Sequence, residues 1–295
     1  MVVTGRQMPL AMTPPTWAGL TLDRPRVMGI LNVTPDSFSD GGAYADPAGA
    51  IDAGRALAVA GADIVDVGGE STRPGAHPID PAEEIRRTIP VIRALATAGV
   101  RVSIDTRNAA TMEAALDAGA AIVNDVSALA HDPAAAPLLA TRRVPVVLMH
   151  MRGTPATMMA QAAYGDVAAD IAAELAVRIA AAEAAGIARD AICLDPGIGF
   201  AKHPAHSIEV LRRLPELAAL GRPLLVGISR KGFIGRLSGV PEPHNRLAGS
   251  LAAGLFALSR GAAILRVHDV GATVEAVRVW RVLDVHRWQG MSDDV

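Results

Sequence analysis

The sequence lacks several features that would place it in a class at once. It has a single cysteine, Cys193, which excludes an internal disulfide framework and fits a reducing compartment. The formal net charge is −2 at pH 7, so bulk electrostatics favours neither nucleic acid nor a membrane as a partner. There is no uncharged apolar run of about 18 residues, and the N-terminus shows no basic-then-apolar signal pattern. These absences predict a soluble cytoplasmic protein.

The short motifs of several enzyme classes are also missing. The sequence contains no HExxH, no His/Cys set with zinc spacing, no GxSxG, no Walker loop and no GxGxxG. Metalloproteases, serine hydrolases, P-loop proteins and Rossmann folds are therefore excluded. Cys193 lies inside an apolar run, which predicts a core position. His150 ends another such run with no evident partner, so its role stays open.

What the sequence does contain is a pattern repeated eight times. A short apolar run rich in β-branched residues ends in a polar group, and Ala-rich segments of helical length follow. The runs end at Asn32, Glu70, Asp105, Asn124, His150, Asp195, Arg230–Lys231 and His268. This alternation is typical of a (β/α)8 TIM barrel, an α/β fold whose active site lies at the carboxyl ends of the strands. We expect a single barrel domain over 26–285, an N-terminal extension over 1–25 with no assigned role, and a flexible tail over 286–295.

Helix boundaries are also legible. Asp-Pro pairs at 46–47, 80–81 and 132–133 each predict an N-cap followed by the first helical residue, and Glu83 is the expected capping-box partner of Asp80. Six glycines precede new apolar runs and are expected to end helices: Gly61, Gly99, Gly119, Gly186, Gly221 and Gly261. Long connections at 32–46, 69–80 and 151–164 follow the first, second and fifth strands. We expect them to be lids over the site.

One group of side chains suggests an anion site. Arg266 and His268 lie two apart on the last strand and so leave the same face. With Arg73 of the second long loop, they suit a diphosphate. Asn32 is an uncharged oxygen ligand suited to Mg2+ that keeps water and diphosphate oxygens. An ordinary surface or salt-bridge pair is the alternative for Arg266 and His268. A closed barrel would, however, make the strands of Asn32 and Arg266 neighbours.

A second group suits a flat heterocycle. Asp105, Asn124 and Asp195 end strands three, four and six, and Lys231 follows strand seven. A carboxylate accepts the paired N–H donors of an aminopyrimidinone, an amide both donates and accepts, and a lysine donates to a ring carbonyl or nitrogen. Each residue alone is more often a helix cap or turn former. Together, at one end of a barrel, they predict recognition of a guanine-like edge.

Seven segments of the chain resemble the dihydropteroate synthase family. They are MGILNVTPDSFSDGG (28–42), DVGGESTRPGA (66–76), SIDT (103–106), LMHMRG (148–153), LDPGIGF (194–200), GISRK (227–231) and RVHDV (266–270). The resemblance runs from about residue 26 to residue 283. One alternative is a pterin-binding methyltransferase domain, which would not need the SRK lysine, the RVH pair or the first loop motif. Another is a non-catalytic relative that keeps the barrel as a binding or assembly module.

The resemblance implies a transferase of folate biosynthesis. It would join p-aminobenzoate to 6-hydroxymethyl-7,8-dihydropterin diphosphate, with early loss of diphosphate, and would be a Mg2+-dependent homodimer that binds no nucleic acid and no membrane. Asp105, Asn124, Asp195 and Lys231 match the pterin pocket, Asn32 matches the Mg2+ ligand, and Arg73, Arg266 and His268 match the diphosphate contacts, with Thr72 beside them. Phe38, Pro74 and Phe200 match the aminobenzoate pocket, where sulfonamides also bind, and Met149 and Gly227 would pack against the rings. Asp105, Arg73, Lys231, Arg266 and His268 are the expected catalytic residues.

The chain departs from the family pattern at two positions. Ala201 stands where relatives with a GFGK-type motif have glycine, and Gly232 stands where many have serine. If backbone N–H groups hold the aminobenzoate carboxylate, Gly232 still serves. These changes bear on sulfonamide affinity more than on activity.

Overall fold

The computed structural model describes residues 14–34, 47–71, 75 and 78–284, and its centre is a sheet of eight parallel strands. The strands are β3 (Arg26–Asn32), β4 (Ile64–Gly68), β5 (Val102–Asp105), β6 (Ile122–Asp125), β7 (Val146–Met149), β8 (Ile192–Asp195), β9 (Leu225–Gly227) and β10 (Ile264–Val267). They pair in the order β8-β7-β6-β5-β4-β3-β10-β9. A parallel bridge from Leu194 to Leu224 joins the two edges and closes the barrel. The predicted (β/α)8 architecture is therefore confirmed.

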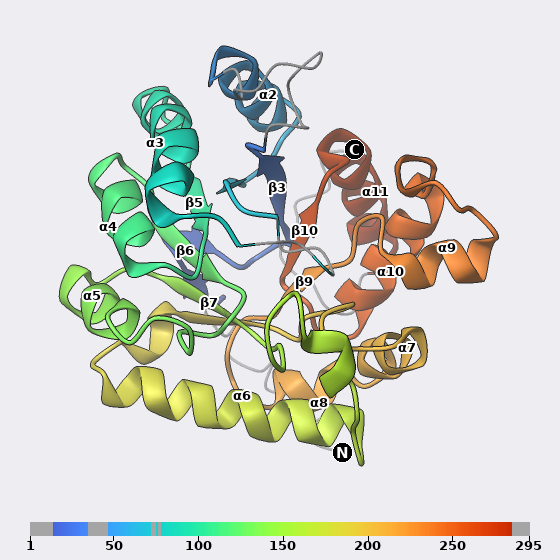
Figure 1. The fold of residues 1–295 in the computed structure, drawn as a ribbon. Helices are drawn as coiled ribbons and strands as arrows, with labels where there is room; N and C mark the ends of the chain where they lie inside the picture. Colours follow the sequence, from blue (N-terminus) through green and yellow to red (C-terminus); the bar gives the residue numbers. More distant parts are fainter. Residues whose placement is uncertain (1–13, 35–46, 72–74, 76–77, 285–295) are drawn as a thin grey trace, which may run out of the picture.

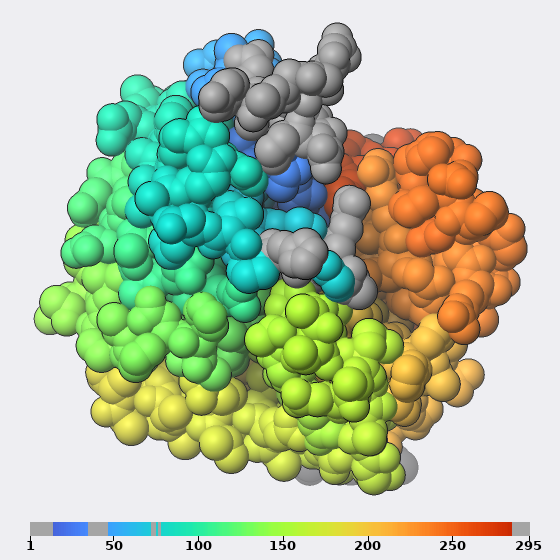
Figure 2. All heavy atoms as spheres, in the orientation of Figure 1, coloured from blue at the N-terminus to red at the C-terminus, as the bar shows by residue number. Residues whose placement is uncertain are grey.

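Helices surround the barrel in chain order (Figure 1). They are α2 (Pro47–Val59), α3 (Pro81–Thr97), α4 (Ala109–Asp117), α5 (Ala135–Arg142), α6 (Val167–Ala184), α7 (Pro204–Arg212), α8 (Leu214–Ala218), α9 (Gly232–Ser238), α10 (Leu247–Ser259) and α11 (Val270–Leu283). Short 3-10 turns lie at η1 (Met158–Gln161), η2 (Arg189–Ala191) and η3 (Pro243–Asn245). In the space-filling view the early, blue part of the chain and the late, red part lie near each other toward the top (Figure 2).

The core lies between the strands and this ring of helices. Strand β4 is buried along its whole length, as a parallel strand covered on both faces must be. Helix α3 turns Val91, Ile92 and Leu95 toward it, and all three side chains are fully buried. Each contributes about 2 kcal/mol of hydrophobic stabilisation. This packing holds the carboxyl ends of the strands in one fixed ring.

The helix boundaries largely follow the sequence signals. All six glycines that were expected to end helices have positive φ values, between 70° and 116°. Asp80 caps α3 by accepting a hydrogen bond from the Ala82 N–H at 2.8 Å. Glu83 is not its reciprocal partner as predicted, because its carboxylate binds Arg86 and Arg87 instead. The prediction at 132–133 was also early, since α5 begins at Ala135.

Part of the N-terminal extension closes the bottom of the barrel. Strands β1 (Thr16–Trp17) and β2 (Leu20–Thr21) form an antiparallel hairpin. The Trp17 side chain is 1% exposed, and its indole N–H donates to the Ala191 carbonyl at 3.0 Å. It packs with the first inward residues of the strands, among them Cys193, whose predicted core position is confirmed. The sequence had assigned no role to this segment.

Residues 35–46 of the first long connection and residues 72–74 and 76–77 of the second lie outside the described residues, as do 1–13 and the predicted flexible tail. The third, after β7, is described, and its middle forms η1. Within the described part of the chain, no helix has the length and apolar character needed to cross a membrane.

Candidate active site

Arg266 is the centre of a polar layer at the carboxyl ends of the strands. From β10 its Nε donates to Asp66 Oδ2 at 2.6 Å, and its Nη2 donates to Asp105 Oδ2 at 2.6 Å. Asn124 of β6 donates from Nδ2 to the same Asp66 oxygen at 3.0 Å. Residues from four strands, 200 positions apart in sequence at most, thus share one hydrogen-bond network. The convergence that the sequence predicted for Asp105, Asn124 and Arg266 is confirmed.

Asp66 was missed as a member of this site. It lies in the middle of β4, within the apolar run IVDVG, and its side chain is fully buried. Asp66 does not end its apolar run, which closes at Glu70, and so the pattern of polar run ends did not indicate it. An unpaired acid inside a buried strand was the available signal, because such a charge requires a partner.

Burial strongly perturbs the acids of this layer. Desolvation raises the pKa of Asp105 to about 7, even though Arg266 opposes the change, and the Asp66 carboxylate adds to it. Asp66 Oδ1 and Asp105 Oδ1 are buried and have no hydrogen-bond partner within the described part of the chain. Unsatisfied acceptors of this kind cost about 1–3 kcal/mol each, and a ligand that donates hydrogen bonds to them would offset that cost.

Asp195 and Lys231 form the next part of the rim. Asp195 Oδ1 accepts from the Gly197 N–H at 2.7 Å, and burial raises the pKa of its carboxyl. A Cβ at position 227 would lie 3.6 Å from Asp195 Oδ2, so Gly227 leaves that oxygen uncovered. Burial lowers the pKa of Lys231 to about 8, with Asp195 acting against the change.

Two apolar residues border these groups as expected. Lys231 Nζ lies 4.5 Å from the centroid of the Phe200 ring, which is within reach of a cation–π contact. Met149 ends β7 opposite Asp195 in the sheet register and is 4% exposed. Helix α9 begins at Gly232 with Lys231 at its N-cap, so a helix start follows the lysine.

His268 stands just beyond β10. Its N–H and its Nδ1 lie 3.2 and 3.1 Å from Ser229 Oγ. Burial, with Arg230 and Arg266 nearby, lowers the pKa of His268 to about 4. The imidazole is therefore neutral at pH 7 in the free protein, and among the described residues Arg266 and Lys231 bring positive charge to this rim. Ser229 is a contact that the sequence interpretation did not identify.

Asn32, the last residue of β3, lies on the same rim. Strands β3 and β10 pair directly, as predicted for a closed barrel. A Cβ placed on Gly68 would meet Asp105 Cβ at 3.5 Å and Asn32 Oδ1 at 3.9 Å. The bare backbone at Gly68 thus opens a space between the Asn32 amide and the Asp105 carboxylate. The other predicted site residues, Phe38, Thr72, Arg73 and Pro74, lie outside the described residues.

Comparison with known proteins agrees with this geometry. The family model for pterin binding enzymes matches residues 28–268. The dihydropteroate synthase of Neisseria meningitidis serogroup B is 48% identical over 271 residues, which cover 90% of this chain and 95% of that protein.

Solved structures give the same result. A structure of the Xanthomonas albilineans dihydropteroate synthase with 4-aminobenzoic acid superposes with a TM-score of 0.85 at 51% identity, covering 90% of this chain and 96% of that one. A structure of the enzyme from the same organism in complex with 7,8-dihydropteroate has a TM-score of 0.81 at 48% identity, covering 90% and 95%. The chain belongs to the dihydropteroate synthase family of pterin-binding enzymes.

Proposed function

We propose that the chain carries out the reaction for which its family is named. It joins p-aminobenzoate to 6-hydroxymethyl-7,8-dihydropterin diphosphate and yields 7,8-dihydropteroate and diphosphate, a step of folate biosynthesis. The observation that supports this most directly is the polar layer around Arg266, in which acceptors suited to a pterin and donors suited to its leaving group lie side by side.

The pterin ring has its complement in four side chains. Asp105, Asn124, Asp195 and Lys231 supply two carboxylates, an amide and an amine at one end of the barrel. Carboxylates accept the paired N–H groups of an aminopyrimidinone, and the amine donates to a ring acceptor. The site is largely desolvated, so each bond is stronger there than it would be in water.

Departure of diphosphate is the step that most needs electrostatic help. Arg266 uses Nε and one Nη2 N–H on Asp66 and Asp105. Its other N–H groups have no hydrogen-bond partner among residues 14–34, 47–71, 75 and 78–284, and we assign them to the leaving anion. Lys231 adds a second positive charge, and His268 adds a donor. Arg73 completes this set in the proposal. Asp105, when ionised, stabilises the positive charge that spreads into the pterin ring as the diphosphate leaves.

A magnesium ion fits this chain through one residue. Asn32 Oδ1 borders the space above Gly68, and an amide oxygen is a ligand that Mg2+ accepts. The described residues hold no group of three or more His, Cys, Asp or Glu side chains that would enclose a metal. Such an ion would therefore take most of its ligands from diphosphate and water. When bound, it would neutralise charge on the diphosphate oxygens.

The amine needs little assistance from a base. An aniline nitrogen is uncharged at neutral pH, which agrees with the lack of a His–Asp hydrogen bond next to Lys231 in the part of the chain that the structure describes. Phe200 and Met149 offer apolar surface to an aromatic ring at this end of the site and help to keep out water, which would otherwise capture the pterin cation.

The deciding assay measures diphosphate release and 7,8-dihydropteroate formation with both substrates present. We expect equimolar products that depend on p-aminobenzoate, and inhibition by a sulfonamide that competes with p-aminobenzoate. Asp195→Asn should raise the KM for the pterin substrate. Release of diphosphate without any pteroate product would contradict the proposal, and methyl transfer would favour the methyltransferase alternative. No turnover at all would favour a binding module.

We also propose that the chain is a homodimer. Several apolar side chains of the last two helices are exposed, including Phe256 of α10 and Val279, Val282 and Leu283 of α11. Clusters of this kind are common at subunit contacts. Light scattering of the purified protein tests this. Its cytoplasmic location stays a prediction.

A further inference from the structure

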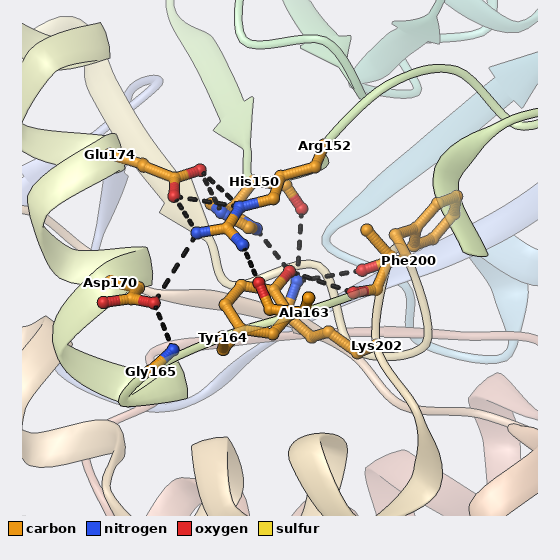
Figure 3. A network of polar contacts seen from close by, with 10 residues as sticks. His150, Arg152, Ala163, Tyr164, Gly165, Asp170, Glu174, Phe200 and Lys202 are labelled. Carbon is orange, nitrogen blue, oxygen red and sulfur yellow. Dashed lines mark hydrogen bonds and ion pairs between the residues drawn. The ribbon is translucent and has the colours of Figure 1, made fainter. Parts of the chain in front are cut away.

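Lys202 is a buried lysine next to the active site that the reaction proposed above does not use. It follows β8 in the loop that carries Phe200 and is 3% exposed. Its Nζ donates to His150 Nδ1 at 2.9 Å, to the Phe200 carbonyl at 3.0 Å and to the His150 carbonyl at 3.5 Å (Figure 3). One ammonium group thus ties the end of β7 to the loop after β8.

Lysine is rare in this sequence, which suggests that an arginine could not replace Lys202. Lys202 and Lys231 are the two lysines of the whole sequence, in which every other basic side chain except histidine is arginine. Both lie beside the site, and burial lowers the pKa of Lys202 to about 7. A guanidinium is a planar fork, whereas an ammonium is a compact donor that meets three acceptors around one point. The geometry at Lys202 requires the compact group.

His150 links Lys202 to helix α6. Its Nδ1 accepts from Lys202, so its proton lies on Nε2, which faces Glu174 Oε2 at 3.0 Å. Burial, with Lys202 adding to it, lowers the pKa of His150 to about 4, so the ring is neutral at pH 7. Glu174 also pairs with Arg152 of the loop after β7. The partner that the sequence did not reveal for His150 is therefore this chain of contacts.

Tyr164 holds the loop after β8 at Ala201, the residue that follows Phe200. Its hydroxyl donates to the Ala201 carbonyl at 2.9 Å, and the Arg152 guanidinium stacks 4.0 Å from the centroid of its ring (Figure 3). Ala201 has a φ of 47°, in the left-handed region that costs a residue with a Cβ about 1–2 kcal/mol. The loop thus keeps an unfavourable backbone conformation while two neighbouring carbonyls are held by side chains.

The held segment carries Phe200, whose ring faces Lys231. At its start, a Cβ on Gly197 would lie 2.0 Å from the His150 carbonyl oxygen, so the loop is pressed against the end of β7. The backbone that carries the Phe200 ring is therefore held by Lys202 at the Phe200 carbonyl, by Tyr164 at the next carbonyl and by the close approach of Gly197 to β7.

We propose that Lys202, His150 and Tyr164 are positioning residues, which hold Phe200 at the aminobenzoate end of the site. The proposal rests on the function proposed above and deepens it. These residues touch no substrate. They act through the backbone of residues 200–201, and so they govern binding of the aromatic amine and leave binding of the pterin to Asp105, Asn124 and Asp195.

The test compares the KM values of the two substrates. In Lys202→Met the three hydrogen bonds are lost at similar side-chain length, and we expect the KM for p-aminobenzoate to rise about tenfold or more. In Tyr164→Phe a single hydroxyl is lost, and a rise of about three- to tenfold is expected, as for one hydrogen bond. The KM for the pterin diphosphate should change less than about twofold in both. Arg142→Met, which removes an exposed ion pair with Asp117, is the matched control and should change neither value.

The outcomes are distinct. A selective rise for p-aminobenzoate supports the proposal. Unchanged values, or an equal rise for both substrates, overturn it. If Lys202→Met does not fold, Tyr164→Phe alone decides by the same criterion. A wild-type protein that makes no 7,8-dihydropteroate refutes the proposed function itself, a result that no variant is needed to see.

Discussion

Replacing Asp66 by asparagine should move the pH dependence of catalysis while leaving the substrate contacts in place. Asp66 is fully buried below Arg266 and raises the pKa of Asp105 by like-charge repulsion. Because Asp105 stabilises the pterin cation as a carboxylate, kcat/KM should fall as the pH drops through the pKa of Asp105, which lies at about 7. In Asp66→Asn that repulsion is gone, so the acid limb should shift to lower pH.

The size of the shift follows from the geometry. Both carboxylates bind one guanidinium through contacts of 2.6 Å, so we take the centres of their charges to be about 5 Å apart. Two unit charges at that distance repel by about 3 kcal/mol at an effective dielectric constant of about 20. Relaxation around Arg266 reduces this, and we expect the limb to move down by about one to two pH units.

The assay is steady-state kcat/KM for the pterin diphosphate between about pH 5 and pH 9. The basic limb provides an internal control, because it is set by Lys231, whose pKa is about 8. The charged groups that shift this pKa are Asp195, Arg266 and Asp105 and do not include Asp66, so the basic limb should stay in place in Asp66→Asn. Glu84→Gln is the matched variant, because Glu84 is also buried and ranks behind Asp66 in its effect on Asp105. An acid limb that stays in place in Asp66→Asn, or moves further in Glu84→Gln, would refute the reasoning.

Three further predictions concern stability. Arg266→Ala should abolish turnover, as its predicted catalytic role also implies. It should also lower the free energy of unfolding in chemical denaturation by about 3–5 kcal/mol, because Asp66 and Asp105 lose a shared buried partner. A denaturation midpoint equal to that of the wild type would contradict this. Trp17→Ala should lower the free energy of unfolding by about 3–5 kcal/mol, and Trp17→Phe by less, because only the alanine leaves a large cavity at the bottom of the barrel. Equal thermal midpoints for the two variants would show that Trp17 does not fill this end of the barrel. Arg143 is exposed and ends α5 at a φ of 54°, so Arg143→Gly should stabilise the protein by about 1 kcal/mol with unchanged activity, which a thermal melt and one rate measurement check.

The sequence by itself determined the fold and most of the rim. Apolar runs that end in polar residues specify strands with functional side chains at their carboxyl ends, and glycines in the left-handed region end the helices between them. Such signals are local, because a strand needs only its own pattern of side chains and a helix end needs only its last turn. That is why the sequence indicated Asp105, Asn124 and Asp195 from their positions at the ends of apolar runs, and Arg266 from its place two residues before His268.

Tertiary structure decided what local patterns cannot carry. In the sequence Asp66 is an unpaired acid in an apolar strand, and only the pairing of distant strands places Arg266 of β10 beside it. The role of His150 likewise depends on hydrogen bonds with Lys202 and Glu174, which lie on two other segments of the chain. Trp17 became the floor of the barrel because closure of the sheet left an apolar end to cover. Each of these roles depends on contacts between residues far apart in the chain, and a linear sequence records neither the distance nor the burial that turns those pairs into one site.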